Sequence, residues 1–217
     1  VMADASIEDI FLPYNIVGAR KLERLKALNG RVTLAVTADS PDTVAGYAAT
    51  FSEDEQLTVL VECDTGTARC GVQTPAQALA LARQIEMAPG LRFGGLMTYP
   101  PVNGATQVQA FMTKAKALIE ANGLTVKVVS SGGTPSMMQA GQAPVASEYR
   151  PGTYVYNDRS LVARGVCDWR DCALTVLATV VSVPFKEGSL AAADVALQAM
   201  AMQAKVAARL LHPQRKP

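Results

Sequence analysis

Short apolar segments alternate with amphipathic segments along the first 160 residues or so of the chain. The apolar segments are continuous and rich in β-branched residues, which is typical of strands buried on both faces. Six strand candidates follow one another, at residues 10–14, 31–38, 57–63, 91–99, 125–131 and 152–157. Helical stripes of apolar residues lie between most of them, over residues 16–29, 41–51, from 75 onward and 105–122. The pattern therefore predicts an α/β protein with a parallel sheet covered by helices.

The ends of the predicted helices carry recognisable signals. Ser40-Pro41 and Thr74-Pro75 each place a capping hydroxyl before a proline that suits the first helical turn. Gly30 follows the stripe of residues 16–29, at the position where glycine commonly ends a helix.

Polar residues come directly after one predicted strand after another, which bears on the architecture. In a (β/α)8 barrel all strand ends converge on one face, whereas an open sheet concentrates them at a single switch point. The polar clusters are at 14–15, 64–69, 98–99 and 130–134. They favour an incomplete TIM-type barrel with about six of the eight strands.

The character of the chain changes after about residue 166. Residues 172–184 predict one long strand, and residues 190–211 predict an Ala-rich helix. The chain begins with VMADASIED rather than Met, and this segment resembles the last turn of a helix. We interpret the sequence as an incomplete copy of a longer barrel. Its two unpaired sheet edges predict aggregation or pairing with something that covers them, and a homodimer is one such arrangement.

Composition and charge exclude several classes of protein. Lys and Arg total 20 against 19 Asp and Glu, a net charge of +1, so a dedicated nucleic-acid binder is not expected. The chain has no apolar run of about 18 residues and no basic segment followed by an apolar one at its start, so neither a membrane span nor a secretory signal is predicted.

Cysteine and histidine usage narrows the chemistry. Cys63, Cys70, Cys167 and Cys172 match neither a CxxC pair nor a zinc signature, so a reduced, cytoplasmic setting is the simplest interpretation. The single histidine, His212, lies near the end of the chain, which excludes a Ser-His-Asp triad and a multi-histidine metal site from its body.

Two segments are candidates for binding an anion. In residues 61–72, a turn after a strand delivers Arg69, whose guanidinium suits an anionic oxygen; the alternative is a solvated arginine. In residues 130–135, two glycines precede Thr134-Pro135 at the start of a short helix. Bare N–H groups of this kind form a phosphate cradle, and the alternative is an ordinary βα turn.

Aromatic and basic residues complete the predicted site. Tyr99 ends a strand, where it can stack on a flat ring, donate a proton or simply line the rim. Pro151 forces Arg150 into an extended conformation. Within the strand predicted at 152–157, Tyr154 and Tyr156 are expected on one face, although their β-propensity alone could explain them. Together the segments describe a site for a flat, phosphorylated anion such as pyridoxal 5′-phosphate (PLP).

Five segments, in this order and spacing, closely resemble the D-threonine aldolase and D-serine dehydratase-like family of alanine-racemase-type PLP enzymes. They are LPYNIVG at 12–18, VECDTGTARCGV at 61–72, GLMTYP at 95–100, SSGGTP at 130–135 and EYRPGTYVYNDR at 148–159. The resemblance covers about residues 1–184 and implies a barrel followed by a β-domain. It also implies a lyase that cleaves a D-β-hydroxy amino acid into glycine and an aldehyde.

The resemblance also implies roles for individual residues. Arg69 would face the phenolic oxygen of the cofactor, Tyr99 would lie beside the pyridine ring as the catalytic candidate, and Arg150 would lie near the pyridine nitrogen. The phosphate would be bound by Ser131, Gly132, Gly133, Thr134, Gly152 and Thr153.

The sequence departs from the family in two places. In the family a Schiff-base lysine sits on the first barrel strand, and no lysine of this chain falls in an equivalent motif. The family also holds a divalent metal through a His and an Asp of its β-domain, and these ligands have no counterpart here. The implied domains are a partial PLP-binding barrel at 1–165, the first strand of the β-domain at 166–184, and an unmatched helical tail at 185–217.

Three alternatives to a D-threonine aldolase-like lyase stay open. The first is a D-serine dehydratase-like or amino-acid-racemase-type PLP protein. The second is a barrel that binds PLP or phosphate without turnover. The third is a phosphate-binding barrel without PLP, such as a sugar-phosphate isomerase, for which Asp64 would be the available catalytic carboxylate.

Overall fold

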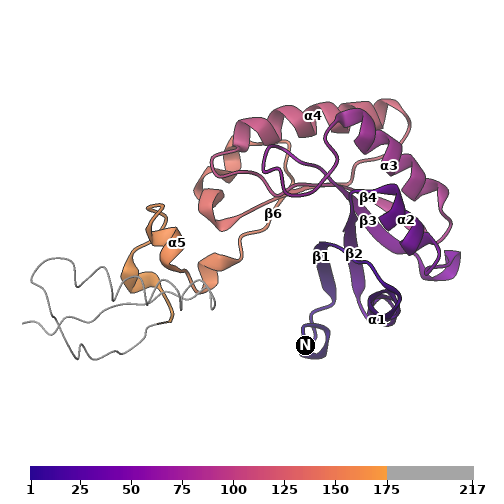
Figure 1. The fold of residues 1–217 in the computed structure, drawn as a ribbon, viewed down its shortest axis with the longest axis horizontal. Helices are drawn as coiled ribbons and strands as arrows, with labels where there is room; N and C mark the ends of the chain where they lie inside the picture. The colour runs from indigo at the N-terminus through magenta and orange to yellow at the C-terminus, as the bar shows by residue number, and fades with distance from the viewer. Residues whose placement is uncertain (175–217) are drawn as a thin grey trace, which may run out of the picture. The chain divides into compact units, whose positions relative to one another are not determined.

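The structure, a computed structural model, describes residues 1–174 of the chain (Figure 1). It divides into two compact units, Val1–Arg150 and Pro151–Pro217. The first unit contains the sheet and the helices that pack on it.

The sheet of the first unit has six strands in the order β1-β2-β3-β4-β5-β6, and every neighbouring pair is parallel. The strands are β1 Asp9–Asn15, β2 Thr33–Ala38, β3 Leu57–Glu62, β4 Leu91–Met97, β5 Val128–Ser131 and β6 Glu148–Tyr149. The α-helices are α1 Ala19–Asn29, α2 Pro41–Ala48, α3 Pro75–Met87 and α4 Ala105–Ala121. Short 3₁₀ segments complete the unit, η1 Ala3–Ala5, η2 Glu53–Glu55 and η3 Thr134–Gln142.

The strand order confirms the incomplete barrel. Each strand pairs with the next along the chain, without the reversal that defines a doubly wound sheet. The sheet is also curled. The guanidinium of Arg150, just after the last strand β6, lies 5.7 Å from the ring centroid of Phe11 on the first strand β1, which brings the two ends of the sheet together. The unit is therefore a curled half-barrel, with helices on its outer face (Figure 1).

A glycine permits the close approach of two neighbouring strands. Gly95 on β4 has φ +141°, and a Cβ at this position would lie 2.0 Å from the carbonyl oxygen of Val128 on β5. The pairing of β3 with β4 also shifts register between Val59 and Leu60. Gly95 thus sits at an irregularity of the sheet that no other residue could occupy without moving a strand.

The core lies between the outer face of the sheet and the helices. Val36, Val59 and Leu96 contribute from the strands, and they belong to one cluster with Ile85 of α3 and Met112 of α4. All five side chains are fully buried. Burial of such a side chain stabilises the fold by about 1.5–3 kcal/mol, so this layer holds the helices on the sheet.

Both predicted helix starts are confirmed. The Ser40 hydroxyl accepts a hydrogen bond from the N–H of Thr43 at 3.3 Å. Thr74 forms a full capping box with Gln77, each side chain bonding the other residue's backbone.

The predicted sixth strand, at 152–157, is wrong. The sixth strand is β6, and residues Thr153–Val155 instead form the 3₁₀ turn η4. Pro151 has no N–H to donate and therefore ends the ladder directly after Arg150. The expectation that Tyr154 and Tyr156 share one face of a strand fails with it. The fifth strand is also shorter than predicted, since it begins at Val128.

The described part of the second unit consists of short turns. Besides η4 it contains α5 Arg159–Val162, capped by the Asp158 side chain, and η5 Trp169–Asp171. The strand predicted at 172–184 lies beyond residue 174 for most of its length, and the helix predicted at 190–211 lies wholly outside the described residues. Among residues 1–174, no helix combines the length and apolar character needed to cross a bilayer.

Candidate functional site

Polar residues of the first unit gather at the carboxyl ends of β3 to β6, which we call the rim. The loop after β3 contains Arg69, Tyr99 follows β4, the glycine pair at 132–133 follows β5, and Arg150 follows β6. The parallel arrangement brings these four segments to one end of the curled sheet.

The loop after β3 is fixed by Asp64. One oxygen of its carboxylate accepts hydrogen bonds from the N–H groups of Gly66 and Thr67, both at 2.9 Å, and of Ala68 at 3.2 Å. Desolvation acts to raise the pKa of Asp64, but hydrogen bonds from Gly66, Ala68 and the Gln73 side chain lower it below its usual value. The loop is therefore built around an ionised carboxylate, which suits a structural role for Asp64 rather than proton transfer.

Arg69 is held between an aromatic ring and a buried carboxylate. Its guanidinium carbon lies 4.5 Å from the ring centroid of Tyr99, and its Nη2 lies 3.8 Å from Oε1 of Glu62. Glu62 is almost completely buried at the end of β3, whereas the Arg69 side chain is 48% exposed. Arg69 is thus oriented by the protein while part of its donor fork faces solvent.

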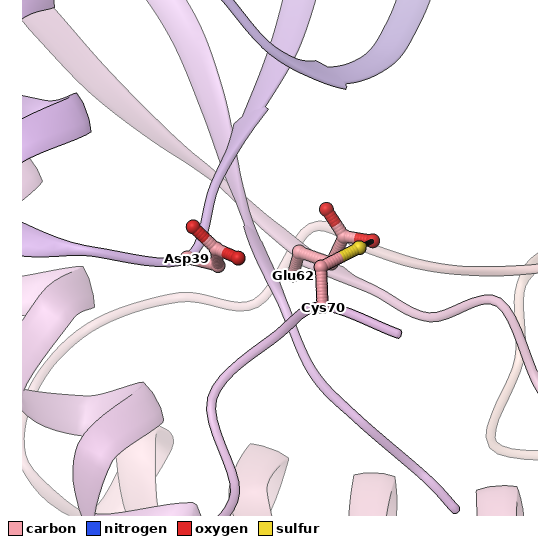
Figure 2. A group of neighbouring side chains, drawn as sticks. All are labelled: Asp39, Glu62 and Cys70. Atoms are coloured by element: carbon pink, nitrogen blue, oxygen red, sulfur yellow. Dashed lines mark hydrogen bonds between the residues drawn. The ribbon is translucent and has the colours of Figure 1, made fainter. Parts of the chain in front are cut away.

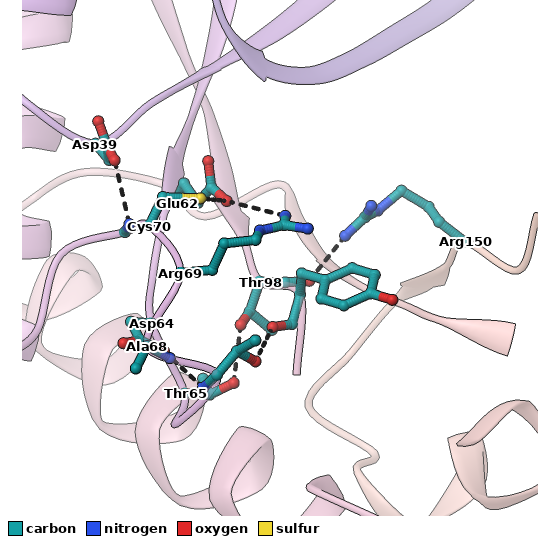
Figure 3. A network of polar contacts seen from close by, with 12 residues as sticks. Asp39, Glu62, Asp64, Thr65, Ala68, Arg69, Cys70, Thr98 and Arg150 are labelled. Carbon is teal, nitrogen blue, oxygen red and sulfur yellow. Dashed lines mark hydrogen bonds and ion pairs between the residues drawn. The ribbon is translucent and has the colours of Figure 1, made fainter. Parts of the chain in front are cut away.

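Arg150 approaches the same region from the other side (Figure 3). Its Nε donates to Oγ of Ser130 at 2.7 Å, and its Nη2 donates to the carbonyl oxygen of Thr98 at 2.8 Å. Glu148 lies 3.9 Å from Nε and is also hydrogen-bonded to Ser130. Desolvation lowers the pKa of Arg150, and the charges of Glu148 and Glu62 oppose it. Arg150 ties β4, β5 and β6 together.

The glycine pair, Gly132 and Gly133, lies against Arg150 and Tyr99. A Cβ on Gly132 would lie 2.8 Å from the backbone nitrogen of Arg150, and one on Gly133, which has φ +139°, would lie 3.6 Å from Cε2 of Tyr99. Within residues 1–174, no group accepts a hydrogen bond from the N–H of Gly132 or Gly133. Tyr149 holds the segment by donating to the carbonyl oxygen of Gly133 at 2.9 Å. Two close, unused N–H donors are the arrangement that an anion requires.

The structure therefore brings together five of the residues predicted from sequence. These are Arg69, Tyr99, Gly132, Gly133 and Arg150. Ser131 is buried and lines a cavity of about 20 Å³ between α4 and η3, and Thr134 is buried at the start of η3. Gly152 and Thr153 belong to the second unit. The cofactor-binding roles of all these residues stay predictions.

Sequence reasoning missed the residues that hold the two arginines in place. Glu62 supports Arg69, and Ser130 and Glu148 support Arg150. Glu62 had a detectable signal, because it is a charged residue at the end of the otherwise apolar segment LTVLVEC. Ser130 and Glu148 lie inside the segments SSGGTP and EYRPGTYVYNDR that the sequence singled out, but their support of Arg150 depends on contacts between separate strands and could not be predicted.

Asp39, Glu62 and Cys70 form a cluster (Figure 2). Arg69 lies next to it, 3.8 Å from Glu62 (Figure 3). The ligand atoms of the three clustered residues lie within 4.8 Å of one another, close enough to hold a metal ion. Each already has a protein partner, however. The Cys70 thiol donates to Oε1 of Glu62 at 2.9 Å, and Asp39 accepts from the N–H of Gly71 at 3.2 Å. We interpret the cluster as a hydrogen-bond network that supports the loop carrying Arg69.

Comparison with known proteins identifies the class to which this fold and rim belong. Residues 10–160 match the family described as "Alanine racemase, N-terminal domain", and the chain belongs to that family.

Among individual proteins, the chain is similar to the D-threonine aldolase of Arthrobacter sp, with 30% identity over 202 residues, 83% of this chain and 51% of that protein. It is also similar to the D-threo-3-hydroxyaspartate dehydratase of Delftia sp. (strain HT23), with 31% identity over 192 residues, 82% of this chain and 50% of that protein. The crystal structure of D-threonine aldolase from Filomicrobium marinum superposes with a TM-score of 0.69 and 29% identity, covering 75% of this chain and 47% of that one. The chain thus spans about half the length of the curated relatives it matches.

Proposed function

We propose that this chain binds PLP at the rim formed by β3 to β6 and serves a lyase that cleaves D-β-hydroxy amino acids into glycine and an aldehyde. Members of the family are PLP enzymes, and the similar proteins are named aldolases and dehydratases. The observation that carries the proposal is the grouping of Arg69, Tyr99 and the unused N–H groups of Gly132 and Gly133.

We assign the residues of the rim to the parts of PLP as follows. The N–H groups of Gly132 and Gly133 suit the phosphate, and Ser131 and Thr134 are its further proposed ligands. The exposed side of the Arg69 guanidinium suits the anionic phenolic oxygen, since a charge-assisted hydrogen bond to such an oxygen is strong. Tyr99 offers a ring for stacking, and Arg150 is proposed near the pyridine nitrogen.

When bound, PLP withdraws electrons from the bond that breaks at the α-carbon of the substrate. The chain's own contribution is orientation and charge. Glu62 and the Tyr99 ring hold Arg69 in place before any ligand arrives, so its donors need little reorganisation. Tyr99 is the proposed catalytic residue, because its side chain is 38% exposed at the rim and its hydroxyl can give or take a proton there.

The lysines favour a second candidate, a protein that binds PLP or phosphate without turnover. Covalent attachment of PLP needs an amine at the site. Among residues 1–174, no lysine stands at the carboxyl end of a strand. Lys21 and Lys26 are on α1, Lys114 and Lys116 are on α4, and Lys127 precedes β5.

Binding of PLP is tested by equilibrium dialysis of the full chain, followed by competition with inorganic phosphate. We expect saturable binding that phosphate weakens. Gly133→Ala should weaken binding about tenfold or more, because a side chain strains the left-handed backbone that presents the N–H groups. Gly123→Ala is the matched control, since Gly123 is also left-handed, at φ +84°, but faces open space after α4. The absence of saturable PLP binding would contradict the lyase and also a protein that binds PLP without turnover.

The two candidates are separated by incubating the PLP-loaded chain with D-threonine and measuring glycine. Release of glycine supports the lyase, whereas bound PLP without glycine release supports the binding protein. Borohydride reduction before digestion reports any lysine attached to the cofactor, and we expect no such adduct on the lysines of α1 or α4.

A further inference from the structure

Two buried oxygen atoms at the carboxyl ends of β1 and β2 have no hydrogen-bond partner. Within residues 1–174, neither Oδ1 of Asn15 nor Oγ1 of Thr37 forms a hydrogen bond, although both atoms are shielded from solvent. The Thr37 side chain is completely buried, and Asn15 is its register partner in the pairing of the two strands. Buried polar atoms are almost always hydrogen-bonded, so a neighbouring pair of exceptions requires an explanation.

Both atoms belong to the inner face of the half-barrel. Val36 and Ala38 belong to the core under the helices, and side chains alternate between the two faces of a strand. Thr37, which lies between them, therefore points to the opposite face, into the barrel interior. Asn15 shares this face because it is paired with Thr37 across the two strands.

Two carboxylates continue this face towards the rim. Asp39 follows Thr37 by two residues, and the buried Glu62 ends the neighbouring strand β3 (Figure 3). One carboxylate oxygen of Asp39 lies within 4.8 Å of one of Glu62. Among the described residues, Oδ1 of Asp39 and Oε2 of Glu62 accept no hydrogen bond. We call Asn15, Thr37, Asp39 and Glu62 the acceptor wall.

The charges around the acceptor wall favour one further cation. Glu62 has Arg69 at 3.8 Å, and Arg150 has its own carboxylate, Glu148, at 3.9 Å. Asp39 forms no ion pair within residues 1–174. Three carboxylates are thus matched by two guanidinium groups. A group that suits the wall must carry a positive charge and donate several hydrogen bonds.

We propose that the acceptor wall binds a primary ammonium group, that of the D-amino acid substrate. A primary ammonium carries three donors and no acceptor, which suits a surface made of oxygen atoms. The inference deepens the proposed function and rests on it for the molecule that carries the ammonium group. In PLP the reactive carbonyl group is attached beside the phenolic oxygen, the oxygen assigned to Arg69. Arg69 contacts Glu62, so the acceptor wall lies next to the part of the rim where the amine is needed. Asn15 and Thr37 are then substrate-binding residues.

The test titrates the ¹⁵N-labelled full chain, without PLP, with n-propylammonium and follows the backbone amide signals by NMR. We expect saturable shifts centred on the ends of β1 and β2, and none with n-propanol, which has a similar size and no charge. Thr37→Val keeps the shape of the side chain and removes the hydroxyl. It should weaken binding of the probe about tenfold or more, because hydrogen bonds to charged groups are strong.

Unfolding of the same variant separates binding from a structural role. A buried hydroxyl without a partner does not stabilise the fold, so Thr37→Val should leave the urea midpoint unchanged or raise it. Thr58→Val is the matched control near the amino end of β3. The Thr58 hydroxyl accepts a hydrogen bond from Arg92 at 2.7 Å, so this variant should lower the midpoint and keep the affinity for the probe.

Unchanged affinity for the probe in Thr37→Val overturns the proposal, as does equal binding of n-propanol or displacement of the probe by an equal concentration of K⁺. A lowered urea midpoint for Thr37→Val with full affinity also overturns it, in favour of a hydroxyl bonded to a buried water. Because PLP is absent from the titration, failure of amine binding while PLP still binds leaves the proposed function intact.

Two further arms identify the source of the ammonium group. D-Threonine should displace the probe, whereas N-acetyl-D-threonine, whose amine is blocked, should not. Displacement by neither compound overturns the assignment to the substrate. Light scattering with saturating n-propylammonium tests the other source, a lysine of a second copy of the chain. Unchanged association supports a free amino acid, and dissociation by the probe overturns it in favour of that lysine.

Discussion

The two arginines of the rim differ in what they have available for a ligand. Arg150 donates hydrogen bonds to Ser130 and Thr98, whereas Arg69 makes one ion pair, with Glu62 at 3.8 Å, and its side chain is half exposed. Arg69 is therefore the better anion ligand, and Arg150 acts first as a structural link. Sequence alone identified both residues but could not rank them, because the ranking depends on partners contributed by other strands.

Replacement of Arg69 by Gln should weaken PLP binding about tenfold or more, because a charge-assisted hydrogen bond contributes roughly 1.5–3 kcal/mol. Arg92→Gln is the matched control. It removes the same charge at the opposite end of β4, where the Arg92 side chain donates a hydrogen bond to Thr58. Equilibrium dialysis measures both, and equal losses in the two variants would refute a specific role for Arg69.

Tyr47 makes a buried bridge that can be tested by stability. Its hydroxyl accepts from the N–H of Ile16 at 2.8 Å and donates to the carbonyl oxygen of Thr37 at 2.9 Å. Tyr47→Phe leaves both groups without this partner, so we expect a loss of about 1–3 kcal/mol in the free energy of unfolding. Urea unfolding at neutral pH measures it, and an unchanged midpoint would contradict the bridge.

The same tyrosine predicts a dependence on alkaline pH. Desolvation raises the pKa of Tyr47 to about 12, from an ordinary value of 10. Between these values the unfolded chain loses its phenolic proton before the folded chain does, so the tyrosine's stabilisation is complete below pH 10 and is lost towards pH 12. The stability difference between wild type and Tyr47→Phe should therefore shrink over that range, by roughly 2 kcal/mol. Parallel stability curves for the two proteins would count against this.

At the scale of elements, the hydrophobic pattern predicted the strands that lie in the core. It failed for β6, which is held at the rim by polar side chains rather than by apolar packing. β2 to β5 are predictable because most of their residues are buried, and the starts of α2 and α3 carry local capping residues. β6 is two residues long, Glu148 and Tyr149, with no apolar run to detect. The hydrogen bonds and ion pairs that hold Arg69 and Arg150 at the rim could not be predicted either, because the partner residues are distant in sequence.

Glycine substitutions separate sheet geometry from helix propensity. Gly95→Ala should destabilise the fold severely, by several kcal/mol, because the new Cβ meets the β5 backbone and the left-handed φ is strained. Gly46→Ala lies inside α2, where the new Cβ would have ordinary contact with Leu22 at 3.8 Å. It should stabilise by about 0.5–1 kcal/mol. Thermal and urea unfolding test both, and tolerance of Gly95→Ala would argue against the close approach of β4 and β5.

At the scale of the whole molecule, the sheet of the described residues begins with β1 and ends with β6, and each pairs on one side only. An edge of this kind is a template for pairing with another chain. The sequence predicted this exposure, and a homodimer remains our hypothesis for how the edges are covered.

Association through the β1 edge predicts a specific effect of charge. Tyr14 on β1 is 67% exposed, and Tyr14→Lys should reduce self-association, because edge lysines oppose strand pairing. Met87→Lys is the control, since Met87 is 83% exposed but ends α3. Light scattering over a concentration series measures both, and the same effect from the two variants would place the contact elsewhere.

The shortness of β6 has a consequence for solvent exchange. Few backbone bonds hold residues 148–150, among them that from the Arg150 N–H to Ser131 at 2.9 Å. The Arg150 and Tyr149 side chains add hydrogen bonds to Ser130, Thr98 and Gly133. Amide deuteration along this stretch should therefore respond to side-chain truncation far more than deuteration of β3 does. We therefore expect β6 to open locally when the Arg150 guanidinium releases its hydrogen bonds, rather than when its backbone pairing with β5 breaks.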